Sequence, residues 1–205
     1  VSTLEVAQTN KQEVIRQMVG REITDLFPRH RGQLGAPVLE VENLTVSNSR
    51  TGRTALKEIN LTLRAGEVLG VGGLMGAGRT ELLMHLLGAW GKRESGTVRL
   101  EDRELPASPP AKVIQRGMVL VTEDRRRYGL ILEQTIGFNL SLSSLGSLTS
   151  KGFLDPGREF QKNRRLFDLL RIKAPTLEAS VGKLSGGNQQ KVVVGKALMT
   201  EPVVI

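Results

Sequence analysis

Alternating apolar and polar residues mark much of the first half of the chain and predict β-strands there. Val38–Val46 and Ile59–Leu63 both alternate, and the polar stretch Asn48–Arg53 between them has the composition of a turn. A further strand is expected at Thr97–Leu100. Val68–Val71 is apolar at every position, which predicts a parallel strand that is covered on both faces.

Apolar residues three and four positions apart predict helices elsewhere. The expected helices are Gln8–Gly20, Arg79–Leu87, most of Phe138–Ile172, and Asn188–Met199. Two more strands are expected, at Met118–Thr122 and from Val203 to Ile205. Because strands and helices alternate along the chain, the sequence predicts an α/β fold.

Two regions of different composition predict the domain organisation. Residues 1–37 are expected to form a linker helix and a loop, because Pro28, Gly32 and Pro37 interrupt regular structure after the first helix. Residues 38–205 are expected to form one domain. The chain has 205 residues, of which 39% are hydrophobic, and this is enough for one substantial core.

The charge and the rare residue types narrow the classes of partner. The formal net charge is +8, which favours anionic ligands such as nucleotide phosphates, nucleic acid or a membrane surface. Aromatic residues make up 3% of the chain, which argues against a single-strand nucleic-acid binder built on stacking. Cysteine is absent, so disulfides and thiolate metal sites are excluded. No signal peptide or membrane span is expected.

A glycine-rich segment between the apolar strand and the helix that follows it predicts a phosphate-binding loop. It fits the pattern G-x-x-x-x-G-K-[ST] with one departure, since an arginine stands at the lysine position. Glycines let backbone N–H groups approach phosphate oxygens, the helix N-terminus adds partial positive charge, and a hydroxyl follows where Mg²⁺ would sit. The candidate phosphate ligands are Gly73, Gly76, Ala77, Gly78, Arg79 and Thr80. A tight turn without a ligand is the plainer alternative.

A second motif, much further along the chain, strengthens this interpretation. The sequence Leu184-Ser185-Gly186-Gly187-Asn188-Gln189 starts the last expected helix, with the serine as a plausible N-cap and the glycines exposing backbone N–H groups. This string resembles the signature motif of ATP-binding-cassette (ABC) proteins, usually written L-S-G-G-Q, with asparagine at the glutamine position. The resemblance implies a P-loop NTPase fold with an antiparallel β subdomain and a helical subdomain.

Three strings narrow the resemblance. Gly76–Glu81, Thr122–Leu130 and Leu184–Lys191 together look like the C-terminal cassette of tandem ATPases that drive import of simple sugars. Met18–Pro28 is similar to the joint that follows the first cassette in that group. A xylose, ribose or galactose importer is implied, and the sequence does not name the sugar.

The resemblance also implies cofactors, partners and a location. ATP and Mg²⁺ are the implied cofactors, with Thr80 as a Mg²⁺ ligand. The implied partners are the first cassette of the same polypeptide, transmembrane permease subunits and, through the permease, a periplasmic or extracellular sugar-binding protein. The implied location is peripheral, on the cytoplasmic face of the inner membrane. No nucleic-acid partner is implied.

The chain departs from the family pattern at several positions. Glu123 occupies the position of the Q-loop glutamine, which in the family senses Mg²⁺ and the transmembrane subunit. No aromatic residue lies at Ser47–Arg50, where the family stacks adenine on one. The Walker-B aspartate, the catalytic glutamate and the switch histidine are placed beyond Ile205, and His85 is expected to be an ordinary helix residue. Residues 1–205 by themselves are therefore expected to bind ATP weakly and not to hydrolyse it.

Alternatives remain at this point. Arg125, Arg126 and Arg127 either face a membrane partner or form a solvated basic loop. The departures at Arg79 and Glu123 indicate that this half forms the weaker nucleotide site of a pair. A cassette ATPase acting on nucleic acid or ribosomes, and a regulatory pseudo-ATPase, are the two other functions that the sequence permits.

Overall fold

The computed structural model describes residues 3–19, 33–150 and 152–205. The chain divides into two compact units, Val1–Gln33 and Leu34–Ile205. Most of the predicted linker after the first helix, and with it Gly20 and most of the Met18–Pro28 string, lies outside the described residues.

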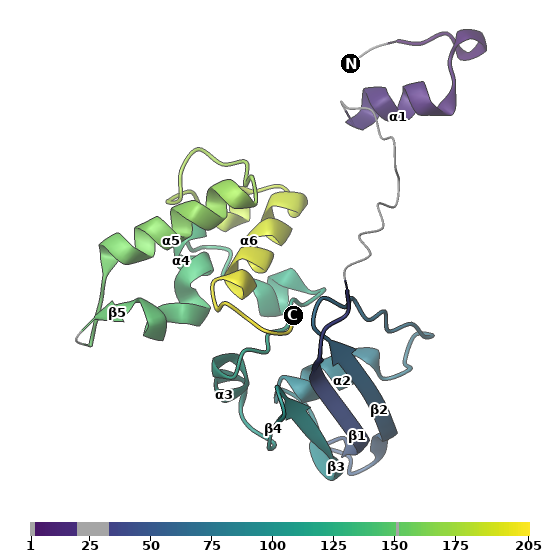
Figure 1. Ribbon diagram of the computed structural model, residues 1–205. Helices are drawn as coiled ribbons and strands as arrows, with labels where there is room; N and C mark the ends of the chain where they lie inside the picture. Colours follow the sequence, from purple (N-terminus) through teal and green to yellow (C-terminus); the bar gives the residue numbers. More distant parts are fainter. Residues whose placement is uncertain (1–2, 20–32, 151) are drawn as a thin grey trace. The chain divides into compact units, whose positions relative to one another are not determined.

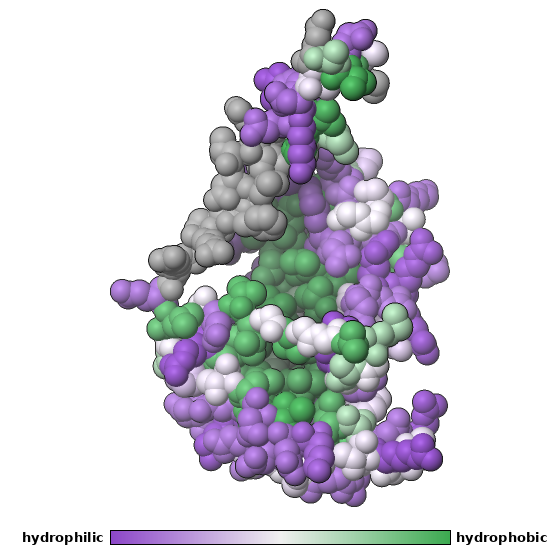
Figure 2. All heavy atoms as spheres, turned by 90° about the vertical axis from the view of Figure 1, so that its right-hand side faces the viewer, coloured by the Kyte–Doolittle hydropathy of each residue, from purple (hydrophilic) through white to green (hydrophobic). Residues whose placement is uncertain are grey.

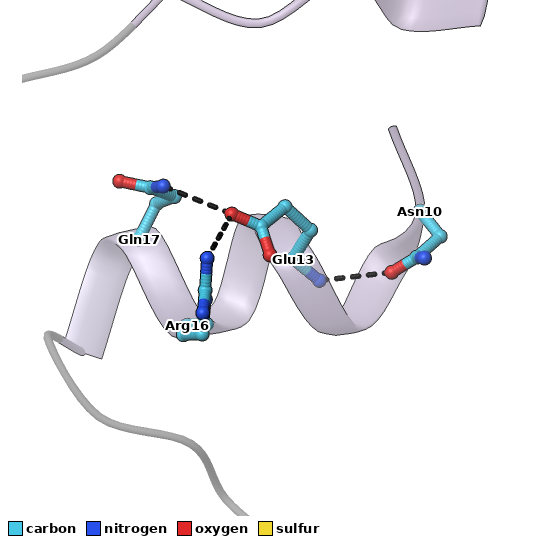
Figure 3. A network of polar contacts seen from close by, with 4 residues as sticks. All are labelled: Asn10, Glu13, Arg16 and Gln17. Atoms are coloured by element: carbon cyan, nitrogen blue, oxygen red, sulfur yellow. Dashed lines mark hydrogen bonds and ion pairs between the residues drawn. The ribbon is translucent and has the colours of Figure 1, made fainter. Parts of the chain in front are cut away.

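The first unit contains one short α-helix that is held by its own polar side chains. It has a 3₁₀ turn, Val6–Gln8, and a helix, α1 (Lys11–Val19), close to the helix expected at 8–20. Asn10 Oδ1 accepts a hydrogen bond from the Glu13 N–H at 2.9 Å, and the Glu13 carboxylate accepts from Arg16 and Gln17 (Figure 3). These two bonds, that from Gln17 first, lower the pKa of Glu13. Such pairs three and four residues apart stabilise a helix.

The second unit begins with an antiparallel sheet that confirms the alternation (Figure 1). Its four strands, in the spatial order β2-β1-β3-β4, are β1 (Pro37–Ser47), β2 (Thr54–Arg64), β3 (Lys92–Leu100) and β4 (Arg103–Glu104). The predicted turn closes through Asn48, whose Oδ1 accepts from the N–H groups of Arg50 and Thr51. Asparagine favours such turns because its side chain replaces a backbone acceptor.

One face of this sheet forms the first hydrophobic core. Leu44, Val46 and Val98 are completely buried, since alternate residues of β1 and β3 point to the same side. Helix α2 (Arg79–Leu86) adds Leu82 and Leu86 to this core, and the short α3 (Pro110–Gln115) adds Val113. The sheet and α2 thus fix the place where the glycine-rich loop ends.

A second hydrophobic core lies among helices, as predicted for 138–172 and 188–199. Its elements are α4 (Ile136–Ser141), η3 (Leu142–Leu148), α5 (Pro156–Leu169), η4 (Val181–Lys183) and α6 (Gly186–Leu198). A short hairpin of two strands with two residues each, β5 (Thr149–Ser150) and β6 (Phe153–Leu154), interrupts the helical stretch. Ile136, Leu140, Val181 and Val192 are completely buried in this core. A π-helical turn, η2 (Arg125–Gly129), precedes α4.

The predicted strand at Val68–Val71 is wrong. No strand covers these residues, and Val68 is 97% exposed. The strands predicted at 118–122 and 203–205 are reduced to a single parallel bridge between Met118 and Val204. A strand needs a neighbour that exchanges backbone hydrogen bonds, and among the described residues Val68–Val71 has none.

The apolar run at Val68–Val71 instead lines a cavity. This cavity has a volume of about 390 Å³, and Leu63, Leu86 and Val121 also line it. Apolar residues gather over a broad area of the face shown in Figure 2. Without a paired neighbour the apolar run is not buried, since Leu69 and Val71 are 41% and 45% exposed, so an apolar pattern alone did not predict burial here.

Candidate functional site

The glycine-rich loop has the backbone conformation that its sequence requires. Gly76 and Gly78 have φ values of +81° and +85°, a left-handed region that favours glycine. A Cβ atom on Gly78 would lie 2.8 Å from Leu56 Cδ2, so a larger residue there would collide with the buried edge of β2. The glycine is needed both for its φ and for the close packing of the loop against the sheet.

This loop presents unused hydrogen-bond donors. The N–H groups of Gly76 and Gly78, and those of Arg79 and Thr80 in the first turn of α2, donate to no acceptor among the described residues. These donors stand at a helix N-terminus, where partial positive charge accumulates. The arrangement fits an anion such as phosphate, as the sequence predicts.

The arginine at the lysine position lies over the start of the same loop. A Cβ atom on Gly73 would lie 3.7 Å from Arg79 Cδ, so the aliphatic part of the side chain runs beside the loop. The guanidinium is exposed and has no hydrogen bond or ion pair within the described part of the chain. It is therefore an available cation at the mouth of the loop.

The structure brings Thr80 and Glu123 together from positions 43 residues apart. Thr80 Oγ1 donates to Glu123 Oε1 at 3.3 Å. A small cavity of about 40 Å³ lies beside them, and Thr122, Asp124 and Tyr128 also line it. A hydroxyl and a carboxylate are oxygen ligands of the kind that Mg²⁺ prefers. The two residues proposed from sequence as metal ligand and Q-loop position are therefore neighbours.

The second motif forms the start of α6, with a different cap from the one predicted. Ser185 occupies the N-cap position, but its hydroxyl caps no backbone N–H. It accepts a hydrogen bond from Asn188 Nδ2 at 3.0 Å, and Asn188 Oδ1 accepts from the Lys173 N–H at 2.9 Å. The serine cap fails because the asparagine at N3 uses the hydroxyl as its acceptor. The N–H groups of the first turn therefore remain open to an outside ligand.

The next residue, Gln189, is 5% exposed and is bonded at both ends of its amide. Its Oε1 accepts from Arg125 Nε at 3.0 Å, and its Nε2 donates to Val181 O at 3.2 Å. Sequence reasoning missed the inward role of Arg125. Three successive arginines give no signal of which one turns inward, and here the π-helical turn directs only the first toward α6.

The other two arginines of this run are exposed. The Arg127 guanidinium lies 5.1 Å from the centroid of the Tyr128 ring, a cation–π contact. The Arg127 N–H donates to Asp124 Oδ1 at 3.1 Å, which caps the turn. The exposure of Arg126 and Arg127 is compatible with either earlier alternative, a solvated basic loop or a surface for a membrane partner. Arg125 fits neither alternative, because its side chain is bonded within the protein.

His85 is a packed helix residue, as predicted. It is buried, and its Nδ1 is 2.9 Å from Trp90 O. Burial lowers the pKa of His85, the bond to Trp90 opposes this, and the charge of Arg93 lowers the pKa further. His30 lies outside the described residues. No group of three or more potential metal-binding His, Cys, Asp or Glu side chains occurs in the described part.

Residues 56–205 match the family described as ABC transporter. This match covers most of the chain, including both motifs. The chain belongs to the ABC transporter family. The α/β P-loop fold and nucleotide binding follow from that membership.

Relatives of this cassette are named as sugar import proteins. The xylose import ATP-binding protein XylG of Geobacillus kaustophilus is 40% identical over 205 residues, which is 100% of this chain and 41% of that protein. The ribose import ATP-binding protein RbsA 3 of Rhizobium etli is 44% identical over 198 residues, 97% of this chain and 37% of that protein. The L-arabinose transport ATP-binding protein AraG of Geobacillus stearothermophilus is 40% identical over 200 residues, with 97% and 39% covered. The chain therefore spans about two fifths of the length of these relatives.

Solved ABC cassettes share the fold. The dimeric structure of MJ0796, described as a bacterial ABC transporter cassette, is similar with a TM-score of 0.64 at 21% identity, covering 80% of this chain and 70% of that chain. The ADP conformation of MJ1267 is similar with a TM-score of 0.62 at 24% identity, covering 81% and 66%. None of the helices described in this cassette combines the length and apolar character that crossing a bilayer requires.

Proposed function

We propose that this chain is part of the ATP-binding, energy-coupling subunit of a bacterial ABC importer for simple sugars. The names of the relatives support the substrate class, and the phosphate loop supports the energy source. The observation that carries the proposal is the cluster of unused backbone donors at Gly76, Gly78, Arg79 and Thr80, next to the Thr80–Glu123 pair. ATP binding and hydrolysis would then drive transport of the sugar.

The residues present fit ATP and Mg²⁺. The free N–H groups of Gly76, Gly78, Arg79 and Thr80 would hold the β- and γ-phosphates, with the Arg79 guanidinium as an additional cation, whereas the Ala77 N–H already donates to Leu74 O. Thr80 Oγ1 and Glu123 Oε1 would hold Mg²⁺, since both are oxygen ligands within 3.3 Å of each other. When bound, Mg²⁺ neutralises phosphate charge and so favours phosphoryl transfer.

Two departures from the family pattern support the proposal that this half is the weaker site. Arginine at position 79 is a planar fork, whereas the usual lysine is a compact point charge, so the γ-phosphate would be held with different geometry. Glu123 accepts hydrogen bonds only, whereas glutamine also donates. We therefore assign this half a binding role, with its signature, residues 184–189, completing the site of the first cassette of the same polypeptide.

The helical part of the cassette carries a groove suited to a permease segment. The groove has a volume of about 480 Å³. Phe138, Leu145 and Phe160 line it and are each at least 39% exposed. Two carboxylates, Glu159 and Glu178, lie at the same groove. An apolar floor with acidic groups fits an amphipathic helix with a basic residue, and such a partner places the protein peripherally on the cytoplasmic face of the inner membrane. A periplasmic or extracellular sugar-binding protein would reach the complex through the permease.

Reconstitution of the full-length protein tests this proposal. The protein would be purified with its co-purifying membrane subunits and placed in vesicles that contain Mg-ATP, with the sugar-binding protein of the system supplied on the outside. We expect ATP-dependent uptake of one of xylose, ribose, arabinose or galactose, and loss of uptake when Thr80→Ala is introduced. ATP hydrolysis without uptake of any of these sugars would remove the substrate assignment, and absence of hydrolysis would remove the energy-coupling assignment.

A further inference from the structure

The π-helical turn η2 is fastened to the signature helix α6 at three places. Arg125 Nε donates to Gln189 Oε1 at 3.0 Å. Further along both elements, Lys196 Nζ donates to Gly129 O, and a Cβ atom on Gly129 would lie 3.1 Å from Val193 Cγ2. Burial lowers the pKa of Lys196, which is consistent with an enclosed contact. The turn and the helix are therefore in direct contact at both ends of the turn.

The same segment reaches the phosphate loop at its other end. Glu123 accepts from Thr80 at 3.3 Å, and the Asp124 N–H donates to Thr122 Oγ1 at 3.2 Å. Glu123 and Arg125 are two positions apart, a separation of at most about 7 Å even in an extended chain. We therefore expect a displacement of the Glu123 backbone to shift Arg125 as well.

The arginine also covers the first turn of the signature. A Cβ atom on Gly186 would lie 3.0 Å from Arg125 Nη2, so the guanidinium packs directly over the helix start. Gln189, which receives its Nε–H, is held from behind by Val181. The contact is thus a directional hydrogen bond to a buried acceptor that is itself held in place. Such a bond restricts the relative position of the two elements more than an ion pair between exposed side chains does.

We propose that Arg125 is a positioning residue that links this cassette's own phosphate loop to its signature motif. It fixes the position of the first turn of α6 relative to Glu123. A ligand bound at Thr80 and Glu123 would then set the orientation in which Ser185–Gly187 faces the partner cassette. The inference rests on the proposed function, because the presented signature acts on nucleotide held by the partner cassette.

A double-mutant cycle in the full-length protein tests the link. Arg125→Ala and Gln189→Ala are each expected to lower kcat for ATP hydrolysis about tenfold, with KM for ATP changed by no more than about twofold, because a charge-assisted bond to the helix start is lost. The double variant is expected to be no slower than the slower single variant. Additive losses would overturn the proposal, since the two side chains would then act independently.

The matched control is Arg103→Ala, which removes the same charge from an exposed side chain on β4. This variant is expected to keep wild-type turnover, and equal losses in Arg103→Ala and Arg125→Ala would overturn the link. Arg125→Lys retains the charge but not the planar Nε–H, so it is expected to behave like Arg125→Ala. Thermal unfolding confirms that each variant is folded.

Hydrogen exchange separates the link from the proposed function. Mg-ADP is expected to slow amide exchange in the peptide that contains residues 184–190 in the wild-type protein, and to leave it unchanged in Arg125→Ala. This readout needs no hydrolysis, so it remains informative if the protein proves inactive. A slowing of the same size in both proteins would show that the signature responds without Arg125 and would overturn the proposal.

Discussion

Glycines lie at the starts of both α2 and α6, before the first in Gly78 and within the second in Gly186 and Gly187, yet the two helix starts differ in what holds them. At the start of α2, Gly76 and Gly78 shape the chain by backbone conformation, and the exposed Arg79 has no polar partner in the described part of the chain. At the start of α6, side-chain hydrogen bonds hold the chain. The Asn188 amide bonds to the Ser185 hydroxyl and the Lys173 N–H. Arg125 donates to Gln189.

The difference indicates that the two sites are prepared for ligand to different degrees. The loop before α2 has donors without acceptors, so a bound phosphate would supply the missing contacts and order the loop. The start of α6 is already fixed by hydrogen bonds within the protein, so it loses less conformational entropy when a ligand binds. The first site would gain stability from its ligand, and the second would offer a ready surface to a ligand held elsewhere.

The largest expected effect is at the prepared site. Ser185→Arg in the full-length protein is expected to lower ATP turnover on the order of 100-fold, because the long cationic side chain occupies the space in front of the open N–H groups. Ser185 is exposed, so the fold should be kept, and loss of the bond from Asn188 Nδ2 should lower the unfolding temperature only slightly. Ser147→Arg, the same substitution at an exposed serine of η3, is the control. Normal turnover in a folded Ser185→Arg protein would remove the signature assignment.

The loop before α2 should be broken most effectively through its backbone. Gly78→Ala is expected to weaken nucleotide binding by about 30-fold or more, from left-handed strain and from the collision with Leu56. Gly52→Ala is the control, because it has φ +67° and no atom within 4 Å of the added Cβ. Calorimetric titration with Mg-ATP measures both. Equal affinities in the two variants would show that the loop conformation does not decide binding.

Removal of the side-chain cation from the loop should have a smaller effect. Arg79→Ala is expected to weaken nucleotide binding about tenfold, the lower end for a charged hydrogen bond, because the guanidinium is exposed. Arg79→Lys restores a compact ammonium and is expected to keep binding within about threefold of wild type. An alanine variant with wild-type affinity by calorimetry would mean that Arg79 points away from the phosphates.

The smallest effect concerns pH and the core behind α2. Burial lowers the pKa of His85 below its ordinary value of 6.5, so the unfolded state binds a proton at higher pH than the folded state. The contribution of His85 to the free energy of unfolding is complete above about pH 6.5 and is lost as pH falls through the lowered pKa. His85→Gln should weaken this acid sensitivity. Denaturant midpoints of the wild type and the variant between pH 7.5 and 5.5 measure it, and the same dependence of the midpoint on pH in both proteins would contradict it.

The local elements and both motifs could be predicted from sequence because their signals are local. Alternation in β1 and β2, the helix at 188–199 and the glycines of the loop each follow from the residue types of one short segment. The proximity of Thr80 and Glu123 was anticipated only through the family resemblance, since 43 residues separate them and no local pattern pairs them. The predicted parallel strand at 68–71 was wrong for the same reason, because pairing depends on distant partners.

The sequence by itself predicted a phosphate loop and a signature motif in one ABC cassette, since glycine conformation and helix starts are properties of the local chain. Tertiary structure decided which side chains serve them. Only folding turned Arg125 toward Gln189 while its two neighbours faced solvent, because the direction of a side chain on a π-helical turn depends on what packs against that turn. It also decided that the Ser185 hydroxyl oxygen accepts from Asn188 Nδ2 and not from a backbone N–H of the helix, because competition between donors for one acceptor is settled by geometry that residue types alone do not contain.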